Sequence, residues 1–382
     1  MRKMIMLALT LTVGIFAAGV LPTRAARVPA SGFVSVSGTT FVLAGHKFIP
    51  QGLNDQDYSS LWDSSNTAPG DQALAGHFKA FSALGFNSVR LNIKADYLDT
   101  PQGWQWLDKR LDEARKYGLK VMLDMHIPNG GAQQDYQPNQ INQQIWSDPK
   151  LQRKFIATWK KISERYATNT TIWSYDLMNE PASRDINRVS VLLQHVCDTI
   201  RQADRNHIVI LQPIQQYDDA YRESYVYAPL HDDKLAYSVH FYRPYGFTVQ
   251  QVSWGITDAR IIKNYPTTST YDGTWDAARL AVELQFTGLA AARAAGVPVV
   301  IGEFGLVFTP EPSGQLAWIK DTLDAARAAG VGWYYWVYQA ATLDSSVALT
   351  DASGVKRQAA LDILSAATKA GTHAALKPIA LR

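Results

Sequence analysis

The feature of this sequence that most restricts its fold is a repeated alternation of short apolar runs with longer amphipathic segments. The short runs, such as 119–126, 235–242 and 297–303, are rich in β-branched and aromatic residues. The longer segments between them, such as 149–166 and 186–203, carry apolar residues at helical spacing. Repeated strand–helix units of this kind build parallel sheets, and eight of them close into a barrel. We therefore predict an α/β fold, a single (β/α)8 TIM barrel.

The same pattern places each element along the chain. Strands are expected at 49–54, 86–91, 119–126, in a run that ends on Asn179 and Glu180, and at 207–212, 235–242, 297–303 and 332–338. Helices are expected at 71–84, around Trp104 and Trp106, and at 149–166, 186–203, 276–295, 313–329 and 351–371. Before them, the alternation and glycines of 33–48 predict a short N-terminal β-hairpin, which we expect to plug the barrel's N-terminal end.

Two of the expected strands end on glutamates. Glu180 is followed by Pro181, which stops strand pairing because it has no N–H to donate. Glu303 is flanked by Gly302 and Gly305, where the backbone can turn tightly or lie close to a ligand. Either glutamate alone would also suit a salt-bridged strand end. As a pair at the C-terminal ends of barrel strands, where active sites lie, they suit glycoside hydrolysis, which needs one protonated and one ionised carboxyl group.

Polar and aromatic residues end other expected strands too. With the two glutamates, they occupy the positions Arg90, His126, Asn179, Glu180, His240, Tyr242, Glu303 and Trp336. In type and in order along the chain, these residues resemble those of family 5 of the glycoside hydrolases, which belongs to a large retaining (β/α)8 clan that includes endoglucanases and mannanases. The resemblance extends over nearly the whole chain after residue 26.

The resemblance implies a role for each of these residues. Glu303 would be the nucleophile and Glu180 the acid and base of a double displacement with retention. The implied substrate-binding set comprises Arg90 and Tyr242 holding Glu303, His240 beside Glu180, Asn179 on the sugar's 2-hydroxyl, His126 on a neighbouring hydroxyl, and Trp336 under the sugar. No metal or cofactor is expected.

The implied reaction is hydrolysis of β-1,4-linked glucan, as in endoglucanases, with β-mannan or another β-glycan of the family as the alternative. A non-catalytic barrel that binds polysaccharide is a further alternative, against which the presence of both glutamates argues. The expected partner is a β-glucan or related plant polysaccharide, and the expected state is a monomer. The sequence contains no HExxH, Walker, GxGxxG or GxSxG motif, so metalloprotease, nucleotide-binding and α/β-hydrolase functions have no support.

Residues 1–26 have the features of a secretory signal peptide. Arg2 and Lys3 precede an apolar run from 5 to 21, and small residues follow where a signal peptidase would cut. The run is short for a membrane span, so we expect its removal, a catalytic domain at 27–382 and a secreted or periplasmic protein. The leader holds three of the 37 basic residues and no acid, which leaves 34 basic against 34 acidic residues. That balance argues against binding to nucleic acid or to an anionic membrane.

Other residues invite both a structural and a functional interpretation. Trp104 and Trp106 stand at helical spacing, so we expect them to pack rather than to bind sugar. Cys197 is the single cysteine, which excludes an intramolecular disulfide. It lies in a helical pattern and is expected in the core, with a catalytic thiol as the alternative.

Two long loops are candidates for the substrate cleft. The segment 127–146 is rich in Asn, Gln and Gly and contains Tyr136 and Trp146, which suits either sugar binding or an ordinary solvated loop. Its proline and glycines are shifted from a common family arrangement, which leaves the substrate open. The segment 243–275 contains Trp254, Tyr265, Tyr271 and Trp275 and is expected to form one wall of the cleft. Its Trp275 belongs either to that wall or to the apolar start of the next helix.

Overall fold

The computed structural model describes most of the chain beyond residue 31. The described ranges are 32–56, 61, 68–70, 74–131, 144–215, 226–252, 255–269, 273–309, 313–339, 346–351 and 354–372. The expected signal peptide therefore lies outside the described residues.

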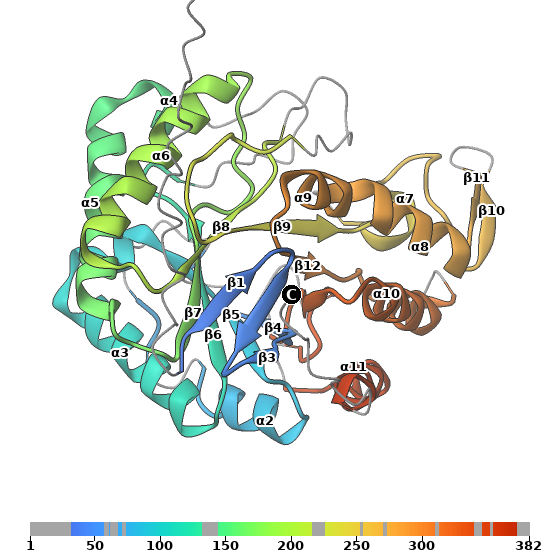
Figure 1. Cartoon of the computed structure of the whole chain (residues 1–382). Helices are drawn as coiled ribbons and strands as arrows, with labels where there is room; N and C mark the ends of the chain where they lie inside the picture. Colours follow the sequence, from blue (N-terminus) through green and yellow to red (C-terminus); the bar gives the residue numbers. More distant parts are fainter. Residues whose placement is uncertain are drawn as a thin grey trace, which may run out of the picture.

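Eight parallel strands close into a barrel, as predicted, in the order β12-β13-β4-β5-β6-β7-β8-β9. Figure 1 shows the helices arranged around the outside of these strands. The strands are β4 (Gln51–Asp55), β5 (Ser88–Lys94), β6 (Lys120–Ile127), β7 (Ile172–Asp176), β8 (Ile208–Leu211), β9 (Leu235–Phe241), β12 (Val299–Phe304) and β13 (Gly332–Tyr335). Their register places Asn54 beside Arg90 and Glu303 beside His240, which brings residues distant in sequence to one end of the barrel.

The helices form where local signals mark their starts. Asp148 precedes Pro149, and its side chain accepts the Lys150 N–H, so one helix begins there. Asp185 caps the next helix in the same way, through the N–H groups of residues 187 and 188. The main helices are α2 (His77–Ala83), α3 (Pro101–Lys116), α5 (Pro149–Tyr166), α6 (Ile186–Ala203), α8 (Ala277–Leu284), α9 (Ala290–Ala295), α10 (Gln315–Ala329) and α11 (Gln358–Thr372). Between β8 and β9, the described residues 212–215 and 226–234 contain no helix.

One predicted helix is interrupted. The expected helix 276–295 is divided into α8 and α9 by a π-helical turn, η2 (Gln285–Leu289), so the prediction of a continuous helix was wrong. The reason is close packing against β9: a Cβ atom at Gly288 would lie 1.8 Å from Val239 and 2.4 Å from the Tyr227 hydroxyl. The wider turn lets the backbone approach the strand that carries His240.

The predicted N-terminal hairpin is confirmed and covers one end of the barrel. Strands β1 (Val34–Ser37), β2 (Thr40–Leu43) and β3 (His46–Lys47) form a small antiparallel sheet in front of the barrel strands in Figure 1. Apolar side chains join the two layers at the strands' N-terminal end. This second core comprises Val34, Phe41 and Phe48 of the hairpin region and Met122, Trp173, Ile208, Ile210, Ala236, Val300 and Tyr334 of the barrel.

The residues with two interpretations are assigned to packing. Trp106 is buried in α3, and Trp104 is partly buried against the main core. Cys197 is buried in α6, and burial raises the pKa of its thiol to about 12, which excludes a reactive thiolate at neutral pH.

Within the two candidate loops, the described aromatic side chains also pack. Trp146 lies in α4 (Gln144–Ser147), is buried, and donates its indole N–H to the Ala182 carbonyl oxygen at 2.7 Å. Trp275 is fully buried at the end of β11 (Gly273–Trp275), just before the N-cap of α8. Tyr136, Trp254 and Tyr271 lie outside the described residues. Sugar binding by segment 127–146 and a cleft wall formed by segment 243–275 therefore stay predictions. None of the helices in the described ranges combines the length and apolarity needed to cross a bilayer.

Candidate active site

The eight residues of the predicted site are connected at the C-terminal side of the barrel, although three of them, Arg90, Asn179 and Glu180, are placed differently from expectation. Arg90 was expected to end its strand, but β5 continues to Lys94 because residues 92–94 keep pairing with β6, so Arg90 is fully buried inside the barrel. Asn179 and Glu180 were expected to end theirs, but β7 ends at Asp176, and both follow in the connecting segment.

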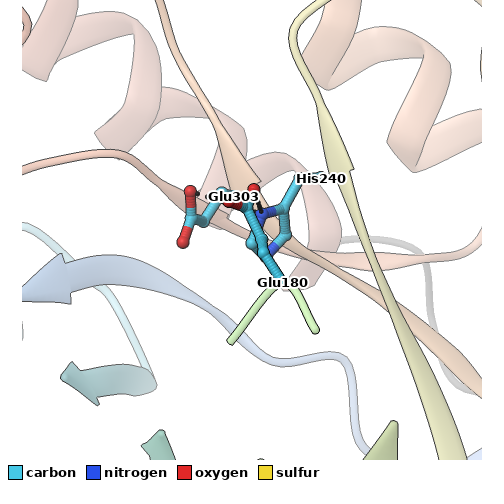
Figure 2. Close-up of side chains that lie close together, drawn as sticks. All are labelled: Glu180, His240 and Glu303. Atoms are coloured by element: carbon cyan, nitrogen blue, oxygen red, sulfur yellow. Dashed lines mark hydrogen bonds and ion pairs between the residues drawn. The ribbon is translucent and has the colours of Figure 1, made fainter. Parts of the chain in front are cut away.

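The two glutamates meet across the barrel mouth. Glu180 follows β7 and Glu303 belongs to β12, and both are nearly buried. Between them lies His240 of β9, whose Nδ1 is 2.5 Å from Glu180 Oε1 and 3.4 Å from Glu303 Oε2. A carboxylate oxygen of each glutamate and a ring nitrogen of His240 all lie within 4.8 Å of one another, and Figure 2 shows the three side chains together.

The backbone at Glu180 takes an unusual conformation. Its φ of +43° is in the left-handed region, which is rare for a residue other than glycine. The strained residue is anchored because its N–H donates to Gln212 Oε1 at 2.8 Å. Conformations of this kind persist where the surroundings enforce them, and they gather at functional sites.

Glu303 is held as a carboxylate by two donors. Arg90 Nη1 donates to Oε1 at 2.7 Å, and the Tyr242 hydroxyl donates to Oε2 at 2.8 Å. Both oxygens therefore accept a hydrogen bond, and one of these bonds comes from a buried cation. This is the setting of an ionised, fixed nucleophile.

Glu180 has the opposite setting. Burial raises its pKa to about 7, although the neighbouring Arg90 and His126 act in the other direction. Burial likewise lowers the pKa of His240 to about 4, so the imidazole is neutral at neutral pH. Below about pH 7 the 2.5 Å contact therefore holds one proton between a carboxyl group and a neutral imidazole. One carboxyl group with a raised pKa beside another that accepts hydrogen bonds on both oxygens gives the division of roles that acid–base and nucleophilic catalysis require.

The remaining predicted residues form one side of the mouth. The His126 ring stacks on that of Trp336 with centroids 5.1 Å apart and planes 13° apart. Asn179 Oδ1 accepts from Arg90 Nη2 at 2.8 Å, which turns its Nδ2 toward His126 at 3.4 Å and makes it a donor at the mouth. Trp336 is partly buried and packs against a small apolar cluster separate from the main barrel core.

The prediction from sequence missed a buried polar layer beneath these residues. It contains Asn54 of β4, Asn92 of β5, Asp124 of β6, Asp176 of β7 and Gln212, all of them buried. Each lies within or directly after a buried barrel strand. Asn92 and Asp124 also stand two positions from Arg90 and His126, respectively, so they face the same side of their strands. That spacing was the available signal.

Glu180, His240 and Glu303 are also close enough to share a metal ion. Arg90 and Tyr242, however, already occupy the oxygens of Glu303. The buried guanidinium 2.7 Å from that carboxylate would also repel a second cation. The arrangement fits acid–base chemistry better than metal binding.

Comparison with known proteins places the chain in a family. Endoglucanase C of Acetivibrio thermocellus is 23% identical over 288 residues, covering 68% of this chain and 82% of that one. Cellodextrinase A of Ruminococcus flavefaciens is 24% identical over 280 residues, covering 71% and 80%. A solved structure of Cel5A from Thermotoga maritima has the same fold, with a TM-score of 0.62 at 20% identity over 83% of this chain and 97% of that one. The model of the family "Cellulase (glycosyl hydrolase family 5)" matches residues 53–342, and the chain therefore belongs to this family of glycoside hydrolases.

Proposed function

We propose that this chain is a secreted endoglucanase-like enzyme that cleaves β-1,4-linked glucan with retention of anomeric configuration. The observation that carries the proposal is the close approach of Glu180 and Glu303, with oxygens within 4.8 Å. Retaining enzymes hold their two carboxyl groups about 5–5.5 Å apart, whereas inverting enzymes leave about 6.5–9.5 Å for a water molecule.

The proposed reaction has two steps. In the first, a carboxylate oxygen of Glu303 attacks the anomeric carbon while Glu180 gives its proton to the glycosidic oxygen, which leaves with the electrons of the broken bond. In the second, Glu180, now ionised, takes a proton from water, whose oxygen displaces Glu303 from the sugar. Both carboxyl groups return to their starting states.

The surrounding residues support these steps. Arg90 and Tyr242 hold the Glu303 carboxylate in position for attack on the sugar. The same two donors stabilise the carboxylate that forms again when water cleaves the ester between Glu303 and the sugar. Asn179 presents its Nδ2 to the sugar's 2-hydroxyl, since its Oδ1 is already bound by Arg90. The stacked His126 and Trp336 offer a polar ring and an aromatic ring to the sugar.

Glucan is the first choice of substrate because related proteins carry the names endoglucanase and cellodextrinase. β-Mannan is the second choice because Cel5A has been solved with mannotriose as well as with cellobiose.

The proposal of secretion rests on the N-terminal leader, and N-terminal sequencing of the exported protein should find a start near residue 27. We propose a monomer, which light scattering tests.

The test is release of reducing sugar from carboxymethylcellulose, barley β-glucan, glucomannan and galactomannan by the wild type, Glu180→Gln and Glu303→Gln. Glu164→Gln, on the exposed face of α5, is the matched control. We expect cleavage of the glucans by the wild type and the control, and its loss in both site variants. Activity confined to galactomannan would reassign the enzyme as a mannanase. The anomeric form of the first product, measured by NMR, would refute retention if it were inverted.

A further inference from the structure

Beneath the two glutamates, one guanidinium faces three carboxyl groups. Arg90 Nη1 contacts Glu303 at 2.7 Å, and Nη2 lies 2.9 Å from Asp124 Oδ1. Nε and Nη2 both donate to Asp176 Oδ2, at 3.1 and 3.0 Å. Arg90, Asp124 and Asp176 have no exposed surface. If all three carboxyl groups were ionised, this layer would carry two uncompensated negative charges out of reach of water, which is very costly.

The ionisable groups that act directly on Asp176 are Arg90 of β5, Asp124 of β6 and Tyr334 of β13. Three more lie one contact further away: His126 through Asp124, Glu180 through Gln212, and Glu303 through Arg90. His240 of β9 contacts Glu180 and Glu303, and Gln212 after β8 is neutral. Arg90 is thus the only permanent cation in direct contact with Asp176 among the described residues.

The two aspartates differ in how their oxygens are used. Asp124 Oδ2 accepts from Asn92 Nδ2 at 2.7 Å and from His126 Nδ1 at 2.8 Å. Its Oδ1 accepts no hydrogen bond, but it lies 2.9 Å from Arg90 Nη2 and so forms an ion pair. Asp176 places three donors on Oδ2, two from Arg90 and one from Gln212 at 2.9 Å. Its Oδ1 is buried and has no hydrogen-bond partner. Burying a charged carboxylate oxygen without a hydrogen-bond partner costs much free energy. Protonation of Asp176 removes that charge and most of the cost.

We propose that Asp176 is protonated in the working enzyme and acts as a positioning residue: through Oδ2 it orients Arg90, while its neutrality leaves the guanidinium charge to Glu303 and Asp124. Burial raises the pKa of Asp176 well above its usual range, and the charge of Asp124 acts in the same direction. Burial also acts to raise the pKa of Asp124, but Arg90, His126 and Asn92 hold it below the usual value. The layer then carries one net negative charge, that of the nucleophile.

This inference rests on the proposed double displacement, and its first test compares matched substitutions. Asparagine mimics a protonated aspartate, since its amide oxygen can accept from Arg90 and Gln212 while its NH₂ replaces the protonated oxygen. Asp176→Asn should therefore keep kcat/KM within about threefold of wild type at pH 6, whereas Asp176→Ala should lose at least about tenfold. Asp124→Asn places an NH₂ against existing donors and should lose at least about tenfold or fail to fold. A tenfold or greater loss in a folded Asp176→Asn would overturn the proposal.

Two further measurements do not depend on hydrolysis. In the folded protein Asp176 keeps its proton, whereas in the unfolded chain it releases the proton above about pH 4. The folded protein therefore loses stability as the pH rises from about 4 toward the folded pKa of Asp176. Asp176→Asn should therefore melt higher than wild type at pH 7.5, and the difference should shrink toward pH 4. The second measurement compares infrared spectra of two variants that both carry Glu180→Gln, one with Asp176 and one with Asp176→Asn. Their difference should contain a carboxylic-acid C=O band from Asp176, and this band should shift in D₂O. A missing band, or a melting difference of the opposite sign, would refute the protonated state even if the wild type hydrolysed none of the substrates.

Discussion

The two ends of the barrel are built from the same strands but from opposite kinds of side chain. In β12, Val300 belongs to the apolar core under the N-terminal hairpin, and Glu303 lies at the mouth three residues later. In β7, Trp173 packs against the hairpin, and Asp176 supports Arg90. One end of each strand serves packing and the other serves chemistry, as in other barrel enzymes.

This difference divides stability from function. Apolar burial at the hairpin end supplies folding free energy, whereas buried carboxyl groups at the mouth must be compensated by hydrogen bonds and by Arg90. Substitutions at the mouth should therefore reduce turnover without a matching loss of stability. Substitutions at the hairpin end should reduce stability without a matching loss of turnover.

The largest effect is expected for Glu180→Gln. Loss of the general acid should lower kcat/KM on barley β-glucan by about 10²- to 10⁴-fold. In the wild type, activity requires the protonated form, so kcat/KM should fall as pH rises above the pKa of about 7. The variant has no proton to lose, so this alkaline limb should vanish. A pH–rate profile of both proteins measures the two effects.

Stability should change in the other direction. The folded pKa of Glu180 is raised above the unfolded value, so the wild type loses stability as pH rises from about 4.3 to about 7. Glu180→Gln should therefore unfold at an equal or higher urea concentration at pH 7. A large loss of stability in this variant would contradict the division between the two ends.

The second effect lies at the hairpin end. Phe41 is buried and meets Trp173 edge to face, with ring centroids 5.0 Å apart. Phe41→Ala should lower the free energy of unfolding by about 3–5 kcal/mol. Turnover per folded molecule at 25 °C should stay the same, because the catalytic groups lie at the opposite end of the strands.

Phe286→Ala is the matched control for that experiment. Phe286 is 76% exposed in η2, so its removal should change stability by no more than about 0.5 kcal/mol. Urea denaturation and active-site titration of both variants give the two quantities. If Phe41→Ala slowed the folded enzyme, the hairpin would be coupled to the mouth and the comparison would fail.

The strength of sequence-based prediction also differed between local and distant features. Helices α5 and α6 begin and end at the predicted residues because Asp148, Pro149 and Asp185 mark their starts locally. The predicted break-free helix at 276–295 was wrong because the turn around Gly288 depends on Val239, which is remote in sequence. Local signals suffice for local structure only.

The candidate site follows the same rule. The glutamate pair could be predicted because each position of the family's pattern can be recognised in the sequence on its own. The structure then connects all eight positions at one end of the barrel. The roles of Asp124 and Asp176 could not be predicted, because they arise from contacts with Arg90 of another strand. A carboxylate in an apolar strand signals a buried partner without identifying it.

The smallest effect is expected for Tyr242→Phe, which removes one of the two donors to Glu303. A hydrogen bond to a charged group contributes about 1.5–3 kcal/mol, so kcat should fall about ten- to a hundredfold while Arg90 still holds the other oxygen. Tyr166→Phe is the matched control, because the Tyr166 hydroxyl of α5 donates to Asp108 of α3 at 2.8 Å, outside the candidate site and the two candidate loops. That variant should lose some stability and no turnover. Equal losses of turnover in the two variants, measured as kcat on barley β-glucan, would mean that the phenol contributes to packing alone. A loss confined to Tyr242→Phe would localise function to the hydrogen bonds on the nucleophile.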